Sequence, residues 1–193
     1  NRRATLDVVV HHLSYRPASR MLSGRNFMLG GSTSLEELAT GIWAGDLSGI
    51  SGRTLPTWAR PFYFPPRSLE TIADWEEKIA AMAPAALNAD IRSIGGTPSW
   101  LLLFFDRLAG IVPGSSRRLA AAFPRLELLI HGGVNFAPYR QAFAERLEGT
   151  GAETREVYPA SEGFIAVADR DDGEGMRLMV DNGLFFEFVP LEE

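Results

Sequence analysis

Three segments of the chain place small or polar residues directly after a predicted strand. They are Gly95-Gly96-Thr97, His131-Gly132-Gly133 and Tyr158-Pro159-Ala160-Ser161-Glu162. Glycine lets the backbone approach a flat ligand closely, a hydroxyl can bond an anion, and an exposed carboxylate can hold a hard cation such as Mg²⁺. Because ligands bind at the carboxyl ends of the strands in an open parallel sheet, these segments could line one cleft. The combination suits a nucleotide and its metal ion.

Each of these residue types also has a structural explanation. Glycine pairs after strands usually form turns, and a lone Glu is usually solvated. Tyr158 could be a core aromatic instead of a platform for adenine, and His131 is expected to be a packed histidine. The acidic residues between 169 and 174 lack the ordered spacing of a calcium loop, so we expect a solvated turn there.

The elements that must position the three segments alternate between strand and helix. The spacing of Ile72, Trp75, Ile79 and Met82 predicts an amphipathic helix beginning near residue 68, which Pro84 should kink or end. A strand over residues 91–94 precedes a turn at Gly95-Gly96, and Thr97-Pro98 then opens a helix that runs to residue 108. A second round places helices at 115–122 and 138–147 around a strand at 126–130.

Strands are also expected at residues 6–12, 25–29 and 156–158, and long loops with short helical pieces between 30 and 70. After Glu162 the helices stop. Strands at 164–168, 176–180 and 184–189 are predicted instead, the last two joined by a hairpin turn at Asp181-Asn182-Gly183. The expected fold class is therefore α/β, with a parallel sheet and crossover helices followed by an antiparallel strand meander.

Composition narrows the function classes. The chain has 193 residues, 46% of them hydrophobic and 22% charged, which is typical of a folded globular domain. A formal net charge of -5 argues against a nucleic-acid-binding protein. No cysteine is present, which excludes disulfides, thiolate metal sites and a cysteine nucleophile and is compatible with the cytoplasm. No apolar run of about 18 residues is present, so we expect no membrane span.

Several longer motifs, in a fixed order, resemble one family. Residues 123–140, 158–164 and 178–190 carry the main likeness, and residues 45–50, 58–61, 74–78 and 98–101 extend it upstream. Together they resemble the auxin-responsive acyl acid amido synthetases, the Gretchen Hagen three family, in a bacterial form. That family belongs to the acyl-adenylate-forming superfamily. The resemblance implies a ligase that activates a carboxylic acid with ATP and passes the acyl group to the amine of an amino acid.

The resemblance also implies site residues. Tyr158 to Glu162 corresponds to the superfamily's Tyr-x-x-Ser/Thr-Glu motif, in which the aromatic ring lies against adenine, the hydroxyl reaches the α-phosphate and the Glu binds Mg²⁺. Gly132-Gly133-Val134 corresponds to the segment that borders adenine. The implied catalytic residues are Ser161 and Glu162, with Glu162 as the metal ligand. The implied ATP and AMP contacts are Gly132, Gly133, Val134, Tyr158, Pro159, Ala160 and Ser161, and candidate acyl-pocket residues are Trp100, Phe136 and Phe164.

Other parts of the family pattern are not found between residues 1 and 193. The Ser/Thr/Gly-rich phosphate loop would precede the chain, and the Tyr-Arg-x-Gly-Asp segment and the small C-terminal domain would follow it. We therefore expect residues 1–193 to be a single-domain fragment, the central part of an adenylation domain, and inactive alone. Two alternatives stay open: an adenylating enzyme with coenzyme A as the acceptor, and a non-catalytic nucleotide-binding or interaction module. The sequence leaves the acid and the oligomeric state open.

Overall fold

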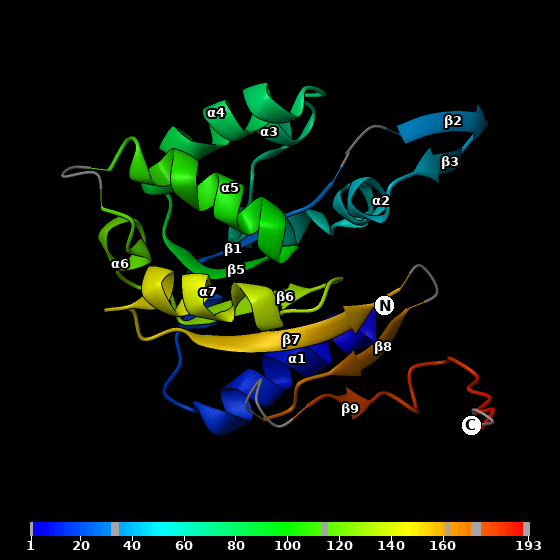
Figure 1. The fold of residues 1–193 in the computed structure, drawn as a ribbon. Coiled ribbons are helices and arrows are strands. Elements are labelled where there is room, and N and C mark those ends of the chain that lie inside the picture. Colours follow the sequence, from blue (N-terminus) through cyan, green and yellow to red (C-terminus); the bar gives the residue numbers. More distant parts are fainter. Residues whose placement is uncertain (1, 32–34, 113–115, 161–162, 171–174, 191–193) are drawn as a thin grey trace.

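The computed structural model describes the whole chain except residues 1, 32–34, 113–115, 161–162, 171–174 and 191–193. A seven-stranded sheet forms its centre, in the order β4-β1-β5-β6-β7-β8-β9 (Figure 1). The first five strands of that order are parallel, and β8 and β9 are antiparallel to their neighbours. The strands are β1 (Arg25–Leu29), β4 (Tyr63–Phe64), β5 (Ile91–Gly96), β6 (Leu128–Gly132), β7 (Glu153–Pro159), β8 (Phe164–Val167) and β9 (Arg177–Leu178). The α/β fold class, with its parallel sheet followed by antiparallel strands, is confirmed.

Helices cover both faces of this sheet. On one face lie α4 (Trp75–Leu87), α5 (Pro98–Ala109) and α7 (Arg140–Leu147), and on the other lies α1 (Arg2–Tyr15) (Figure 1). The larger core lies under the three helices, where phenylalanine rings meet edge to face, as Phe27 does with Phe104 at 4.8 Å. A smaller core joins Val8 of α1 to Val157 and Val167. Both cores hold the parallel strands from which the candidate site is built.

Short elements complete the chain. They are the helices α2 (Leu47–Thr54), α3 (Arg67–Glu70) and α6 (Leu119–Ala122), the 3₁₀ turns Met21–Ser23, Thr57–Phe62 and Ala137–Tyr139, and a separate hairpin of β2 (Leu35–Ala39) and β3 (Ile42–Gly45). The prediction of loops and helical pieces between 30 and 70 missed this hairpin, because neither strand has a clear apolar alternation and neither contains a buried residue.

The strand predicted at residues 6–12 is wrong, since this segment is part of α1. Val8 and His12 are buried against the sheet, whereas Leu6 and Val10 are exposed. A separation of four residues between buried positions is the period of a helix, not of a strand. Burial of that one stripe outweighs the β-propensity of the valine run.

Two helix predictions need correction. The predicted helix from residue 68 is divided into α3 and α4, because Asp74 caps α4 by accepting a hydrogen bond from the Glu77 N–H at 2.8 Å. This helix does not end at Pro84 but continues to Leu87. Ala83 and Ala86 on either side of the proline are fully buried, and their packing offsets the lost backbone bond. The helix predicted at 115–122 is only α6, residues 119–122, and position 115 lies outside the described residues.

The glycines at the end of β5 do not form the predicted turn, because both belong to the strand. Strands are packed tightly there: a Cβ atom at Gly96 would lie 2.9 Å from the Leu29 carbonyl oxygen. Thr97 and Pro98 begin α5 as predicted, and α5 ends at Ala109, one residue beyond the expected end.

The strand predicted at residues 184–189 does not form in the described part of the chain, and β9 is only two residues long. Residues 181–183 do turn, with Gly183 at φ +87°, but no hairpin follows among the described residues. Phe185 is 88% exposed and Val189 is 85% exposed. The sequence has strand propensity, but a strand is stable only beside a partner strand, and none of the described strands pairs with these residues.

Candidate functional site

The candidate site lies where β5, β6 and β7 end at their carboxyl termini. The register pairs Gly96 with His131 and Gly132 with Val157, so the three strand ends are neighbours. A Cβ atom at Gly133 would lie 3.9 Å from the Thr97 Oγ1 atom. The turn after β6 therefore lies close to the start of α5. The structure therefore brings the glycine-rich segments predicted to share a cleft to one edge of the sheet.

The two glycines after β6 have different structural requirements. A Cβ atom at Gly132 would lie 2.1 Å from the Val157 carbonyl oxygen, so only glycine permits the approach of β6 to β7. Gly133 has φ +83°, a left-handed conformation that other residues adopt at a cost. Val134, directly after this turn, is 40% exposed. The turn thus presents backbone atoms and one apolar side chain at the rim of the edge.

Tyr158 is not a core aromatic, because half of the residue, 51%, is exposed. Val157 belongs to the core on the α1 side, and since alternate residues of a strand point to opposite faces, Tyr158 points to the face that α5 and α7 cover. Its register partner on β8 is Ala166, which is too small to cover the ring. The ring is therefore open to a ligand beside the turn at Gly133.

The remainder of the Tyr158 to Glu162 motif leads out of β7. Pro159 is paired with Phe164 of β8, and the Ala160 N–H donates to the Gly163 carbonyl oxygen at 2.8 Å, with the reverse bond at 3.1 Å. Ser161 and Glu162 stand between these two residues in the sequence and lie outside the described residues. The described part of the chain contains no group of three or more His, Asp or Glu side chains that could hold a metal ion.

The structure does not bring the three candidate acyl-pocket residues together. Trp100 lies in the first turn of α5 with its ring 5.2 Å from that of Trp75. Phe136 is 3% exposed and stacks on the His131 ring at 3.6 Å, so it is mainly a core residue. Phe164 packs against the core on the α1 side, on the opposite face of the sheet.

A partly buried polar cluster near the end of β1 was not predicted from the sequence. Glu70, Lys78 and Tyr63 line a cavity of about 20 Å³ together with Gly30 and Gly31. Burial raises the pKa of Glu70 and lowers the pKa of Lys78, although each charge favours the other. Burial and the Glu70 charge also raise the pKa of Tyr63 strongly.

The amphipathic pattern of Ile72, Trp75, Ile79 and Met82 predicts Lys78 on the polar face of its helix, but this is wrong because the residue is only 5% exposed. It lies three residues after Trp75 and four before Met82, which is the spacing of the buried stripe. That spacing could have identified the lysine as a buried charge.

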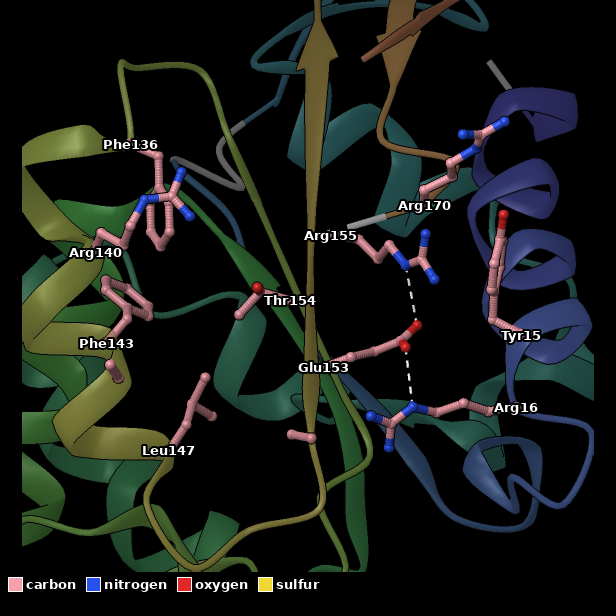
Figure 2. Close-up of a pocket in the computed structure, with 12 residues that line it drawn as sticks. Tyr15, Arg16, Phe136, Arg140, Phe143, Leu147, Glu153, Thr154, Arg155 and Arg170 are labelled. Atoms are coloured by element: carbon pink, nitrogen blue, oxygen red, sulfur yellow. Dashed lines mark hydrogen bonds and ion pairs between the residues drawn. The ribbon is translucent and has the colours of Figure 1, made fainter. Parts of the chain in front are cut away.

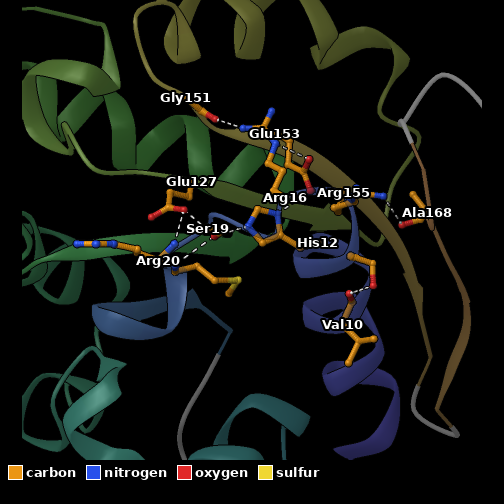
Figure 3. Close-up of polar contacts among 12 residues, drawn as sticks. Val10, His12, Arg16, Ser19, Arg20, Glu127, Gly151, Glu153, Arg155 and Ala168 are labelled. Carbon is orange, nitrogen blue, oxygen red and sulfur yellow. Dashed lines mark hydrogen bonds and ion pairs between the residues drawn. The ribbon is translucent and has the colours of Figure 1, made fainter.

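A second polar network, at the amino ends of β6 and β7, attaches α1 to the sheet (Figure 3). His12 Nδ1 lies 2.6 Å from a Glu153 carboxylate oxygen, and its Nε2 lies 2.8 Å from Ser19 Oγ. The Ser19 hydroxyl donates to Glu127 at 2.6 Å, and the Arg20 N–H donates to the same oxygen at 2.8 Å. This network lies at the opposite end of the strands from the candidate site.

The two carboxylates of the network have lowered pKa values. Burial alone would raise the pKa of Glu153, but hydrogen bonds from Arg155 and His12 and their charges lower it below its usual value. Glu127 behaves in the same way, with Ser19, Arg20 and Arg92 as its partners. The network therefore holds both carboxylates in the charged form.

Comparison with known proteins shows likeness to solved structures and none to a sequence family. No protein-family model matches the chain, and no curated protein matches it in sequence. The fold is similar to a crystal structure of an open conformation of 2-hydroxyisobutyryl-CoA ligase in complex with 2-HIB-AMP and CoA, with 15% sequence identity and a TM-score of 0.46. The similarity covers 88% of this chain and 35% of that one, so this chain spans about a third of the ligase. No helix in the described residues is both long and apolar enough to cross a membrane.

Proposed function

We propose that the chain is the central part of the adenylation domain of an ATP-dependent ligase that activates a carboxylic acid as an acyl-adenylate. The observation that carries this proposal is the juxtaposition of two motifs quoted from the sequence. The turn at Gly133 follows β6, and the exposed Tyr158 is near the end of the neighbouring strand β7, so both lie at the same edge of the sheet. An exposed aromatic ring beside a glycine turn suits a flat base such as adenine.

The start of α5 lies at the same edge, and its features favour phosphate binding there. Thr97 precedes this twelve-residue helix, and within the described residues its hydroxyl makes no capping hydrogen bond. The hydroxyl lies close to Gly133. A helix N-terminus and a free hydroxyl both favour an anion, so the phosphates of ATP are the proposed ligand there.

Ser161 and Glu162 complete the proposal as the catalytic pair. The carboxylate of Glu162 would hold Mg²⁺, since this ion is usually bound by one or two carboxylates together with phosphate oxygens. When bound, the cation neutralises charge that develops as the carboxylic acid attacks the α-phosphorus and pyrophosphate leaves. Ser161 would donate a hydrogen bond to the α-phosphate. The amine of an amino acid would then attack the acyl carbon and AMP would leave.

ATP–pyrophosphate exchange tests this function. The assay uses a form of the protein that includes a phosphate loop, with Mg²⁺ and a panel of aromatic and aliphatic carboxylic acids. We expect exchange that depends on the acid and that Glu162→Ala abolishes. Undiminished exchange in that variant would overturn the assignment of Glu162, and the absence of exchange with every acid would contradict the adenylation proposal.

The acceptor is tested separately. Product analysis with the activating acid, ATP and either a mixture of amino acids or coenzyme A distinguishes an amide from a thioester. We expect the amide, on the strength of the sequence resemblance. A thioester as the sole product would keep the adenylation step and replace the amino acid with coenzyme A.

A further inference from the structure

A cavity of about 630 Å³ lies between α7, the first half of β7 and the end of α1 (Figure 2). Its walls differ in character. The α7 side presents Phe136, Phe143 and Leu147 beside Arg140, whereas Arg16 and Arg155 lie on the α1 side. A volume of this size is within the usual range for small-molecule sites.

Among the described residues that line the cavity, cations outnumber carboxylates. Four of them are arginines, Arg16, Arg140, Arg155 and Arg170, and one, Glu153, is a carboxylate. That carboxylate already accepts hydrogen bonds from Arg16 and Arg155, each at 2.9 Å, so it is saturated. The excess of cations is notable because the chain as a whole carries a net charge of -5.

Arg155 and Arg140 differ in their access to a ligand. Arg155 is 2% exposed, and its guanidinium is fixed by Glu153, by the Ala168 carbonyl oxygen at 3.3 Å and by the Tyr15 ring at 5.1 Å. Arg140 lies over the Phe136 ring at 5.4 Å and forms no ion pair with any described residue. A guanidinium without a carboxylate beside an apolar wall favours an anion that also has an apolar part.

The floor of the cavity adds polar groups from the sheet. The Glu153 N–H donates to the backbone carbonyl oxygen of Glu127 on the β6 side. The Glu156 carbonyl oxygen accepts from the Ala168 N–H on the β8 side. The N–H and C=O groups of successive residues in a strand point alternately to its two neighbours, so those of Thr154 point to the side of β8. Since β8 pairs only with residues 157–159 of β7, it does not cover Thr154. Thr154 lines the cavity, and its side chain points to the α7 side in Figure 2.

From these features we infer that the cavity between α7, β7 and α1 is a binding site for a small organic anion, a carboxylate or phosphate ester with an aromatic or aliphatic body. The anionic group is held by Arg140, and the body packs on Phe143 and Leu147. The site is lined by the first half of β7, whereas the proposed ATP edge lies at the carboxyl end of this strand. The inference does not depend on the proposed function.

The test is titration of the 193-residue chain with benzoate, phenyl phosphate and the neutral benzyl alcohol, followed by calorimetry or NMR. We expect saturable binding of at least one anion, weakened about tenfold by Arg140→Met, and no binding of benzyl alcohol. Arg107→Met is the matched control, because Arg107 is an exposed arginine on another helix that lies outside the cavity, and it should leave the affinity unchanged. The preferred anion tells a carboxylate site from a phosphate site.

Any one of the following results would overturn the inference. They are the absence of saturable binding by both anions, equal affinity in the Arg140→Met variant, and equal binding of benzyl alcohol. Binding of an extended acidic peptide without binding of either small anion would also overturn it, because the cavity would then be a docking groove for a strand. Unchanged circular dichroism and melting temperature in the variant exclude unfolding as the cause of a loss.

Discussion

Replacing Glu153 by Gln should destabilise the fold strongly, because this carboxylate is the centre of the network that attaches α1 to the sheet. It meets Arg155 at 2.9 Å and His12 at 2.6 Å, whose side chains are 2% and 0% exposed, and Arg16 at 2.9 Å. Removing the charge leaves a buried guanidinium without its counter-ion. Breaking a buried ion pair in this way costs about 3 kcal/mol or more in free energy of unfolding.

Urea denaturation followed by circular dichroism measures this cost. With a slope of about 2 kcal/mol per molar urea, the midpoint should fall by about 1.5 M. The matched control is Glu148→Gln, which removes an equally charged partner of Arg118 in a pair that is 60% exposed on both sides. A surface pair of this kind contributes about 0.5 kcal/mol, so the control should hardly move the midpoint.

The dependence on pH gives a second readout of the same prediction. The folded state lowers the pKa of Glu153, so the unfolded chain binds its proton more readily. The stability that this carboxylate contributes is therefore present above its ordinary pKa and lost as the pH falls through the lowered value. The difference in free energy of unfolding between the native chain and Glu153→Gln should therefore become smaller at acidic pH. An equal cost for both Gln variants, or a difference that does not change with pH, would refute the reasoning.

Three further predictions concern the edge and the tail. Gly132→Ala should lower the free energy of unfolding by about 1–3 kcal/mol, since its Cβ atom would lie 2.1 Å from a carbonyl oxygen. The control is Gly151→Ala, where a Cβ atom would have no other atom within 4 Å, and this variant should be nearly neutral in thermal denaturation. Tyr158→Ala should raise the KM for ATP about 5- to 150-fold, as expected for loss of a stacked base, and Tyr158→Phe should change it about twofold at most; equal KM values in all three proteins would contradict stacking. The double substitution Phe185→Ser and Phe188→Ser should leave the melting temperature unchanged and reduce self-association in light scattering, because the two rings are 88% and 75% exposed; a clear fall in melting temperature would show that they are packed.

Local signals predicted the part of the fold that carries the candidate site. The strand, the Thr97-Pro98 pair and the following helix were found because each depends on residues within one or two turns. The order of strands also placed the glycine-rich segments at one edge, since parallel strands end on the same side of a sheet. These features require no knowledge of distant contacts.

The errors share one physical cause, which is burial by residues far away in the sequence. Residues 6–12 form a helix because His12 meets Glu153, a residue 141 positions later. Residues 184–189 have strand propensity but lack a neighbouring strand in the described structure. The arginine-lined cavity was also missed, because it combines the end of α1 with α7 and β7. A local sequence pattern does not show which distant elements pack together.

The most direct test of the central claim is to locate bound ATP on the protein. Photolabelling with 8-azido-ATP in the presence of Mg²⁺, followed by peptide mapping, identifies the residues that surround adenine. The account predicts labelling of the peptides that contain residues 132–134 and 158–160, with protection by excess ATP. Protectable labelling that is confined to other segments, or no protectable labelling at all, would contradict the assignment of this edge as the nucleotide site.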